Sequence, residues 1–255
     1  MCRLILASGQ FSANDILKAA EAMSCGRTAD HDGPTDVHPN GWGALWRDPD
    51  APQGIALHRD VRPLTDSHHE SPVAELDTDF LAVHARHATL PKNHGLQFTH
   101  PLTREAETTW HFMHNGFLPT VHQKLGLPES EFDSREYFDY IIPEGSRRLD
   151  EQQTLERLRA IPAGGSSGNA IAVNSDVAYV IHWTSPGVAS PVYFGMFRLR
   201  TDRYTVIASE RIPDLAPLDQ WEPLAPDSLI EIPLNGSTSS TSSTARQGEA
   251  LHVQH

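Results

Sequence analysis

The sequence predicts an α+β fold in a single domain, with many short strands and few helices. Apolar segments recur from residue 4 to residue 232 without a long polar gap, although hydrophobic residues make up only 38% of the chain. Strand-like segments outnumber helical ones, above all in the second half of the chain. The length of 255 residues suits one large core. We therefore expect one domain over residues 2–234.

The first half of the chain mixes strands with helices. Residues 2–8 (CRLILAS) read as a buried strand, and Ser12 is suited to cap a helix that Gly26 ends. Residues 28–40 have the composition of a loop. Further strands are expected at 41–47, 54–59, 80–89 and 110–114, and further helices at 118–125, 134–142 and 151–161. Asp150 is the expected cap of the last of these helices.

Strands separated by turn residues dominate the second half. They are expected at 169–174, 177–184, 192–200, 204–208 and 228–232. The stretch from Leu90 to Glu107 has little periodicity, and because loops of that length are usually functional, we expect it beside the active site. Residues 235–255 are rich in Ser and Thr and cannot bury enough apolar surface to order themselves, which predicts a disordered tail without catalytic function.

Composition and charge exclude several classes of partner. The formal charge of −13 opposes binding to nucleic acid, which needs clustered Lys and Arg. No stretch approaches the ~20 apolar residues that span a bilayer, and the N-terminus lacks the features of a signal peptide. Cys2 and Cys25 are too few for a disulfide framework, and Cys25 is expected to be a half-buried thiol that closes a helix. We expect a cytoplasmic protein.

Cys2 directly follows the initiator methionine, and its small side chain permits removal of Met1. Removal would place a thiol and a free α-amino group on one residue. The reference pKa values of about 8.5 for the thiol and 7.7–8.0 for the amine let one group relay the proton of the other near neutral pH. The pair is a complete nucleophile and base, so no cofactor is expected. Taken by itself, the alternative that a strand simply begins with a cysteine is stronger.

Seven short motifs give the chain a resemblance to a known family. They are MCRLILAS, NGWGALW, HARHAT, THPLTRE, FMHNGF, FDSRE and VIASE, and they occur in the order found in class II glutamine amidotransferases. Over about residues 2 to 233 the chain resembles the small standalone members that remove γ-glutamyl groups in ergothioneine biosynthesis and in glutathione degradation. The resemblance implies an N-terminal-nucleophile hydrolase fold, a four-layer αββα sandwich of two antiparallel sheets.

Arg86 matches the arginine of the family's R-x-A-T element, which binds the α-carboxylate of the glutamyl substrate. A guanidinium suits this role because its planar fork of donors can bind a carboxylate through two hydrogen bonds. The alternative is a surface salt bridge. The resemblance makes Thr89 a secondary substrate contact, with a structural strand residue as the alternative, and we expect His87 to line the pocket beside Arg86.

Asn115 and Gly116 match the family's oxyanion element, in which the Asn side-chain amide and the Gly backbone N–H face the developing negative charge. The alternative is strong, because Asn-Gly is also the commonest signal for a tight hairpin turn. The position of the pair between the arginine motif and an acidic motif favours the catalytic interpretation.

Asp133 matches the acidic residue that receives the substrate's α-ammonium group. Asp133 and Glu136 also form a D-x-x-E pattern, which predicts a capping box at the start of a helix, and both roles can hold together. The family pattern reads D-S-E, whereas Arg135 intervenes here. A second departure is Asn40, since related sequences tend to carry Asp before G-W-G.

Seven of the 15 histidines fall between residues 84 and 122, which raises the question of a metal site. Neither H-E-x-x-H nor C-x-x-C occurs, and His111 and His114 would face opposite sides of a strand. We therefore expect no metal and interpret most of these histidines as structural.

The sequence predicts a hydrolase that cleaves a γ-glutamyl amide bond of a small molecule through a Cys2 thioester. An alternative is a glutaminase subunit that supplies ammonia to a separate synthase, because the acceptor domain of larger amidotransferases has no counterpart in this sequence. A third hypothesis is a His-rich metal-binding protein without catalysis. The partner is expected to be the substrate itself, with a homodimer or a synthase partner left open.

Overall fold

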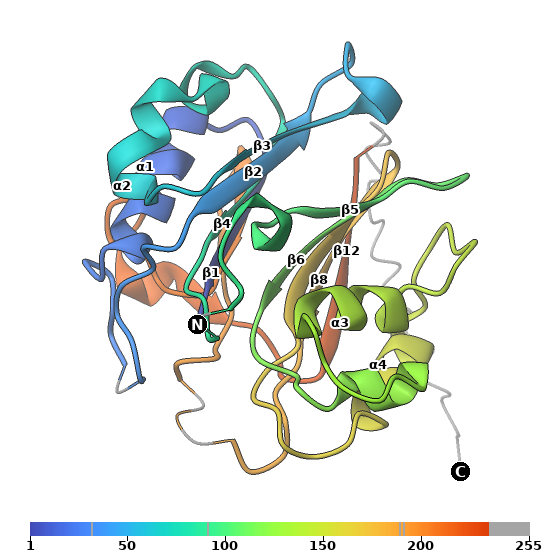
Figure 1. Ribbon diagram of the computed structural model, residues 1–255. Coiled ribbons are helices and arrows are strands. Elements are labelled where there is room, and N and C mark those ends of the chain that lie inside the picture. The colour runs from blue at the N-terminus through green and yellow to red at the C-terminus, as the bar shows by residue number, and fades with distance from the viewer. Residues whose placement is uncertain (32, 91, 189, 191, 235–255) are drawn as a thin grey trace, which may run out of the picture.

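The computed structural model describes residues 1–31, 33–90, 92–188, 190 and 192–234. In this part of the chain two antiparallel sheets lie face to face between helices (Figure 1), and the sequence of layers is helix, sheet, sheet, helix. The predicted α+β sandwich is therefore confirmed. The predicted tail, residues 235–255, lies outside the described residues.

The first sheet has seven strands in the order β11-β9-β10-β1-β4-β2-β3. Their bounds are Arg3–Gly9 (β1), Trp42–Arg47 (β2), Ile55–Asp60 (β3), Phe80–Ala85 (β4), Phe197–Arg200 (β9), Tyr204–Ala208 (β10) and Trp221–Pro223 (β11). β1 lies in the middle, paired with β4 on one side and with β10 on the other, so that Arg3 is opposite Ala85 and Ile5 is opposite both Val83 and Ala208. The N-terminal strand is thus held firmly in the sheet.

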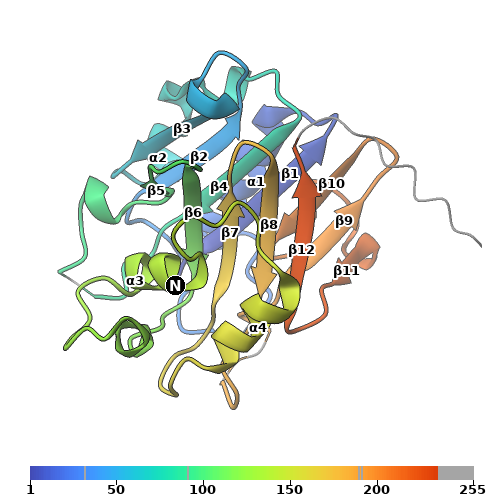
Figure 2. The ribbon, with the colours of Figure 1, turned by 90° about the vertical axis from the view of Figure 1, so that its right-hand side faces the viewer.

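The second sheet has five strands in the order β12-β8-β7-β6-β5, turned toward the viewer in Figure 2. Their bounds are Leu102–Arg104 (β5), Trp110–Asn115 (β6), Asn169–Val173 (β7), Val177–His182 (β8) and Ser228–Pro233 (β12). β6 pairs with β7 through a register that sets Asn115 opposite Asn169. Both residues lie at the end of the sheet where β6 stops.

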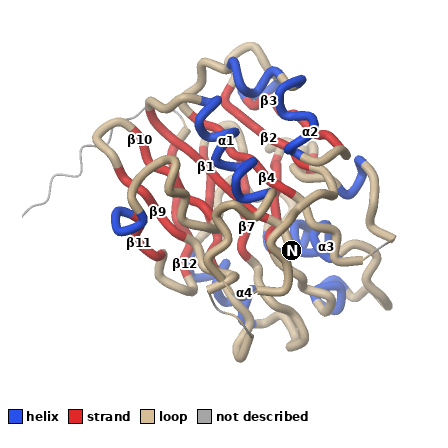
Figure 3. Tube along the Cα trace, turned by 90° about the vertical axis from the view of Figure 1, so that its left-hand side faces the viewer, coloured by secondary structure: helices blue, strands red, loops and turns tan. Residues whose placement is uncertain are grey.

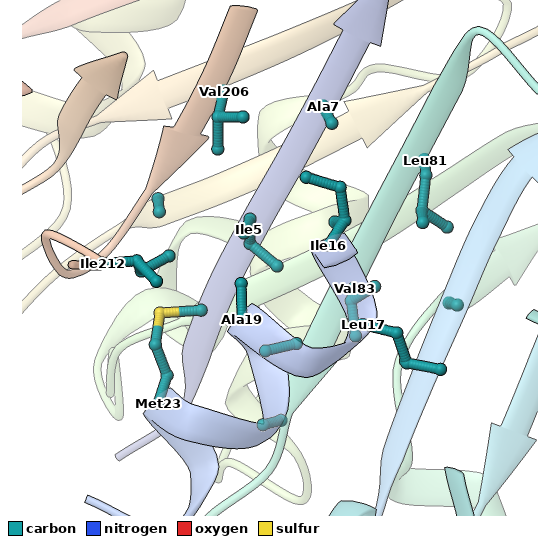
Figure 4. Packing of buried hydrophobic residues seen from close by; sticks show 14 of the residues in the cluster. Ile5, Ala7, Ile16, Leu17, Ala19, Met23, Leu81, Val83, Val206 and Ile212 are labelled. Atoms are coloured by element: carbon teal, nitrogen blue, oxygen red, sulfur yellow. The ribbon is translucent and has the colours of Figure 1, made fainter. Parts of the chain in front are cut away.

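Helix α1 (Ala13–Ser24) covers the outer face of the seven-stranded sheet (Figure 3). The predicted cap is confirmed, because the side chain of Ser12 accepts a hydrogen bond from the backbone N–H of Asp15. Ile16 and Met23 share the apolar face that packs on β1 and β4 (Figure 4). The short helix α2 (Leu64–Ser67) lies beside α1.

Helices α3 (Asp133–Ile141) and α4 (Glu151–Arg159) cover the outer face of the five-stranded sheet. Asp150 caps α4 as predicted, with its carboxylate 2.9 Å from the N–H of Gln153. The first residues of α3 lie at the end of the sheet where β6 stops, since the ring of His114 is 3.0 Å from the hydroxyl of Ser134. This contact brings the start of α3 next to the last residues of β6.

Strand alternation divides the buried residues between two faces of the first sheet. On β1, Ile5 and Ala7 face the core under α1, whereas Leu4 and Leu6 belong to the core between the sheets. Met113 of β6 lies in that same middle core. Cys2 alternates in step with Leu4 and Leu6, and Asn115 alternates in step with Met113. The side chains of Cys2 and Asn115 therefore point into the space between the sheets.

Several predicted elements differ from the structure. The stretch from Leu90 to Glu107 was predicted to lack strands but contains β5, and the short strand β11 was not predicted. Residues 121–125 form a 3₁₀ helix, where a helix was expected over 118–125. The predicted strand 192–200 is confirmed only from Phe197 onward. No helix in the described ranges is long and apolar enough to cross a membrane.

Candidate active site

Cys2 lies immediately before β1 at the end of the central strand of the first sheet. Its side chain is 7% exposed, its thiol is free, and its Sγ is 3.7 Å from the carbonyl oxygen of His87. Met1 is present in the structure, so the nitrogen of Cys2 is an amide nitrogen here. Burial lowers the pKa of the Met1 ammonium to about 6, which leaves an amine at this place largely neutral at pH 7.

Arg86 follows β4, beside Cys2 across the pairing of β1 with β4. It is 3% exposed, which contradicts the alternative of a surface salt bridge. Its guanidinium donates to the carbonyl oxygens of Asn93 at 2.6 Å and Asn40 at 3.4 Å, and no carboxylate of the described residues lies within ion-pair distance. Burial lowers the pKa of Arg86, and the nearby Cys2 and Asp133 side chains oppose this shift. A buried cation without a carboxylate partner is suited to bind an anion.

Asn40 ties the loop before β2 to the segment that carries Arg86. Its backbone N–H donates to the carbonyl oxygen of Arg86, and its side-chain oxygen accepts the N–H of Ala88, both at 2.9 Å. An aspartate could accept the same N–H, so the amide preserves this contact. His87 is half-buried with Nδ1 3.1 Å from the carbonyl oxygen of Val37, and Thr89 is exposed beside it.

Asn115 ends β6, and no hairpin turn follows it. β6 pairs with β5 and β7, and the chain after Gly116 runs on toward a 3₁₀ helix, so the hairpin alternative is wrong. The side chain of Asn115 is 0% exposed, and neither its nitrogen nor its oxygen has a hydrogen-bond partner among the described residues. Its amide is therefore free for a ligand, which is uncommon for a buried polar group.

Gly116 is required by close packing. A Cβ at this position would lie 1.8 Å from the carbonyl oxygen of Ser167 and 2.6 Å from Nε2 of His114. Every other residue type would force these neighbours apart. With no side chain of its own, Gly116 lines the cavity beside Cys2 with its backbone.

Asp133 is the first residue of α3, and its buried carboxylate accepts the N–H of Leu118 at 2.8 Å. The predicted capping box is wrong in detail, because the N-cap position is Phe132 and makes no side-chain cap. Glu136 instead reaches back to the N–H groups of Glu131 and Phe132. Burial raises the pKa of Asp133, and the neighbouring His114 lowers it.

A cavity of about 30 Å³ joins most of the predicted site residues. Its lining includes Cys2, Arg86, His87, Thr89, Gly116 and Asp133. Asn115 is not part of this lining, although Gly116 is. Residues that are far apart in the sequence thus bring a thiol, a cation and a carboxylate together around one small cavity.

The histidines do not form a metal site in the described ranges, where no group of three or more His, Cys, Asp or Glu side chains has the required arrangement. His111 and His114 do face opposite sides of β6, since His111 contacts Thr103 whereas His114 contacts α3. The ring of His84 contacts that of His100, with centroids 4.3 Å apart and planes inclined at 41°.

Sequence reasoning assigned no role to Arg3 and Glu210, although both lie in the motifs quoted above. They form a fully buried ion pair between the start of β1 and the segment after β10. Arg3 also donates to the carbonyl oxygen of Cys2 at 3.3 Å and stacks over the ring of Tyr193, 4.4 Å from its centroid. The available signal was a charged residue within the apolar run of residues 2–8, because such a charge needs a buried partner.

Glu210→Ala is expected to lower the free energy of unfolding by about 3–5 kcal/mol, because it leaves the guanidinium of Arg3 buried without its carboxylate. The matched control is Glu222→Ala, which removes an exposed ion pair with Arg198 and should cost about 1 kcal/mol or less. Urea unfolding of the wild type and the two variants measures both losses of unfolding free energy. Equal losses in the two variants would contradict a structural role for the buried pair.

Comparisons with known proteins identify the family and agree with the fold. The sequence profile of the class-II glutamine amidotransferases matches residues 1–162. Among solved structures, the glutamine phosphoribosylpyrophosphate amidotransferase from B. subtilis has a TM-score of 0.60 at 14% identity over 92% of this chain and 50% of its own. The structure of an allosteric regulatory enzyme of purine biosynthesis gives 0.62 at 14% identity, with the same coverage of both chains.

A shorter structure is also similar. The class-II glutamine aminotransferase domain protein from Silicibacter pomeroyi has a TM-score of 0.54 at 16% identity, over 91% of this chain and 99% of its own. At such low sequence identity, these structural similarities show the fold alone. The chain spans about half the length of the first two structures. A search of curated proteins gives no significant match.

Proposed function

Because the chain belongs to the class-II glutamine amidotransferase family, we propose that it hydrolyses γ-glutamyl amide bonds with the thiol of Cys2 as nucleophile. One observation carries the proposal: the Cys2 thiol, the carboxylate-free Arg86 guanidinium and the Asp133 carboxylate line one cavity. An α-amino acid head group carries one carboxylate and one ammonium. Arg86 and Asp133 complement these two charges, while Cys2 is left for the far end of the glutamyl group.

The reaction requires that Met1 be removed, so that Cys2 carries the free α-amine. Burial at this end of β1 lowers the pKa of the amine of Met1, and the same burial favours a neutral amine on Cys2. The neutral amine accepts the thiol proton, directly or through water, as the sulfur attacks the γ-carbonyl carbon. The C–O π electrons move to the oxygen, which becomes an oxyanion.

In our proposal Asn115 and Gly116 stabilise this oxyanion. The Asn115 amide has no other hydrogen-bond partner in the described part of the chain, and the Gly116 backbone lines the cavity. When the tetrahedral intermediate collapses, the C–N bond breaks and the leaving amine takes the proton from the α-ammonium of Cys2. Water then attacks the thioester, the C–S bond breaks, and glutamate leaves as the sulfur regains its proton.

The cavity of about 30 Å³ has room for little more than one water molecule, so a glutamyl group must widen it. The rim includes the exposed residues Thr89 and Leu90. In our proposal the substrate carboxylate takes over donors of Arg86 that now serve the carbonyl oxygens of Asn93 and Asn40. A carboxylate binds these donors more strongly than a neutral carbonyl does.

Arg86→Ala is expected to raise KM for a γ-glutamyl substrate roughly 10–100-fold with a smaller effect on kcat, because it removes charge-assisted contacts worth about 1.5–3 kcal/mol. Arg62→Ala is the matched control, since Arg62 is exposed and paired with Asp60 and Glu70. Steady-state kinetics should leave the control unchanged. An unchanged KM in a folded Arg86→Ala variant would remove Arg86 from the substrate site.

The identity of the leaving amine distinguishes the two candidate functions. For the standalone hydrolase, binding energy on the amine side should favour a larger γ-glutamyl amide or peptide, so we expect kcat/KM for glutamine to lie well below that for some larger substrate. A screen of γ-glutamyl amides against processed protein, with glutamate detected as the product, measures this. If glutamine is preferred over every larger amide and a co-purifying synthase accelerates its hydrolysis, the ammonia-supplying subunit replaces this proposal.

A further inference from the structure

The cavity beside Cys2 contains an imidazole without a hydrogen-bond partner among the described residues. His100 lines this cavity and is 2% exposed, yet both of its ring nitrogens are unpaired. Buried polar groups are nearly always paired, and each exception in a native protein calls for an explanation. His100 lies in the THPLTRE motif and belongs to the seven clustered histidines, most of which were interpreted from the sequence as structural.

The ring of His100 lines the same cavity as Arg86 and contacts two other rings. It lies against His84, with centroids 4.3 Å apart and planes inclined at 41°, and it lies 6.1 Å from the ring of Phe132, which also lines the cavity and precedes Asp133. Burial, together with the nearby charge of Arg86, keeps the pKa of His100 well below its usual value. The ring is therefore neutral at pH 7, with one nitrogen as a donor and the other as an acceptor.

Packing alone does not account for a histidine at this position. The ring contacts with His84 and Phe132 suit an aromatic side chain, and a phenylalanine would supply one without two unpaired polar atoms. The polar atoms need a ligand that enters the cavity. A neutral imidazole also suits a site that contains a guanidinium, because an imidazolium would be repelled there.

We propose that His100 binds the α-amino acid head of the glutamyl group, donating its ring N–H to the carboxylate that Arg86 holds. This inference rests on the proposed function, because it assumes the orientation set by Arg86 and Asp133. A carboxylate accepts about four hydrogen bonds, so the fork of Arg86 leaves lone pairs for a second donor. His100 is thus a binding residue for the substrate head and takes no proton from Cys2.

His100→Phe tests the assignment because it keeps an aromatic ring and removes both polar atoms. The thermal midpoint should stay the same or rise, whereas KM for a γ-glutamyl substrate should rise roughly 10–100-fold with little change in kcat. His100→Gln restores an N–H donor and should recover part of the affinity. His111→Phe is the matched control: it changes a buried histidine outside the cavity, bonded to Thr103, and should leave KM unchanged.

Binding of glutamate, measured by calorimetry in a Cys2→Ala background, separates this inference from the proposed function. Glutamate should bind roughly 10–100-fold more weakly when His100→Phe is added. Equal glutamate affinity with and without His100→Phe would overturn the inference, as would a fall in kcat with KM unchanged. If the Cys2→Ala protein binds no glutamate at all, the inference fails with the site itself. If glutamate binds but the wild type hydrolyses no γ-glutamyl amide, only the proposed function fails.

Discussion

Cys2→Ala is expected to abolish hydrolysis of γ-glutamyl amides while leaving the fold intact. In the proposed reaction no other group forms the thioester with the γ-carbonyl carbon, because Cys2 supplies the sulfur and, after removal of Met1, the base as well. The substitution removes a single sulfur atom at the edge of the cavity, and β1 stays held by β4 and β10. The thermal midpoint should therefore change little.

Cys25→Ala is the matched control for this variant. Cys25 is half-buried at the end of α1 and does not line the cavity, so its loss should leave turnover at the wild-type level. Intact mass of the active protein tests processing in parallel and should show that Met1 is absent. Activity in the Cys2→Ala variant, or full activity in protein that retains Met1, would contradict the mechanism.

Asn115→Ala is expected to lower kcat about 10²–10³-fold with a small effect on KM, because it removes one donor to the oxyanion. The Asn115 amide makes no hydrogen bond to the described residues, so the substitution should cost no protein–protein hydrogen bond. Stability should consequently be maintained. This combination of a large kinetic loss and an unchanged midpoint is the signature of a ligand-directed amide.

Asn174→Ala provides the opposite pattern and is the control. Asn174 is equally buried, but its side chain donates to the carbonyl oxygen of Arg147 and accepts the N–H groups of Asp176 and Val177. Its loss should lower stability and leave kcat unchanged. If Asn115→Ala resembles Asn174→Ala, with lower stability and normal kcat, then Asn115 holds the strand end and does not stabilise the oxyanion.

Local signals predicted much of the fold. Ser12 and Asp150 were identified as helix caps because capping depends on contacts within three residues, and both make those contacts. The elements that were missed are short. β5 and β11 have three residues each, too few for a periodic pattern, and they exist because β6 and β9 offer an edge for pairing.

The candidate site could be predicted only in part from the sequence. Family motifs located Cys2, Arg86, Gly116 and Asp133, which line one cavity. The roles of the residues that surround these four depend on contacts between parts of the chain that are distant in the sequence. The partner of Arg3 lies 207 residues away, and the unpaired state of His100 is a property of the folded cavity that no local pattern encodes. Asp133 was assigned a cap because D-x-x-E is a local signal, but the helix begins one residue earlier than that signal requires, at Asp133 itself.

The central claim is that the Cys2 thiol attacks the γ-carbonyl carbon of a glutamyl group. A glutamine analogue that carries a chloromethyl ketone in place of its amide keeps a carbonyl at that position and places an alkylating chloromethyl carbon next to it. Incubation with processed protein, followed by peptide mass mapping, should show one label per chain on Cys2, with activity lost in proportion to labelling and glutamate slowing both. Activity that survives complete labelling of Cys2, or that disappears while the label lies on another residue, would contradict the account.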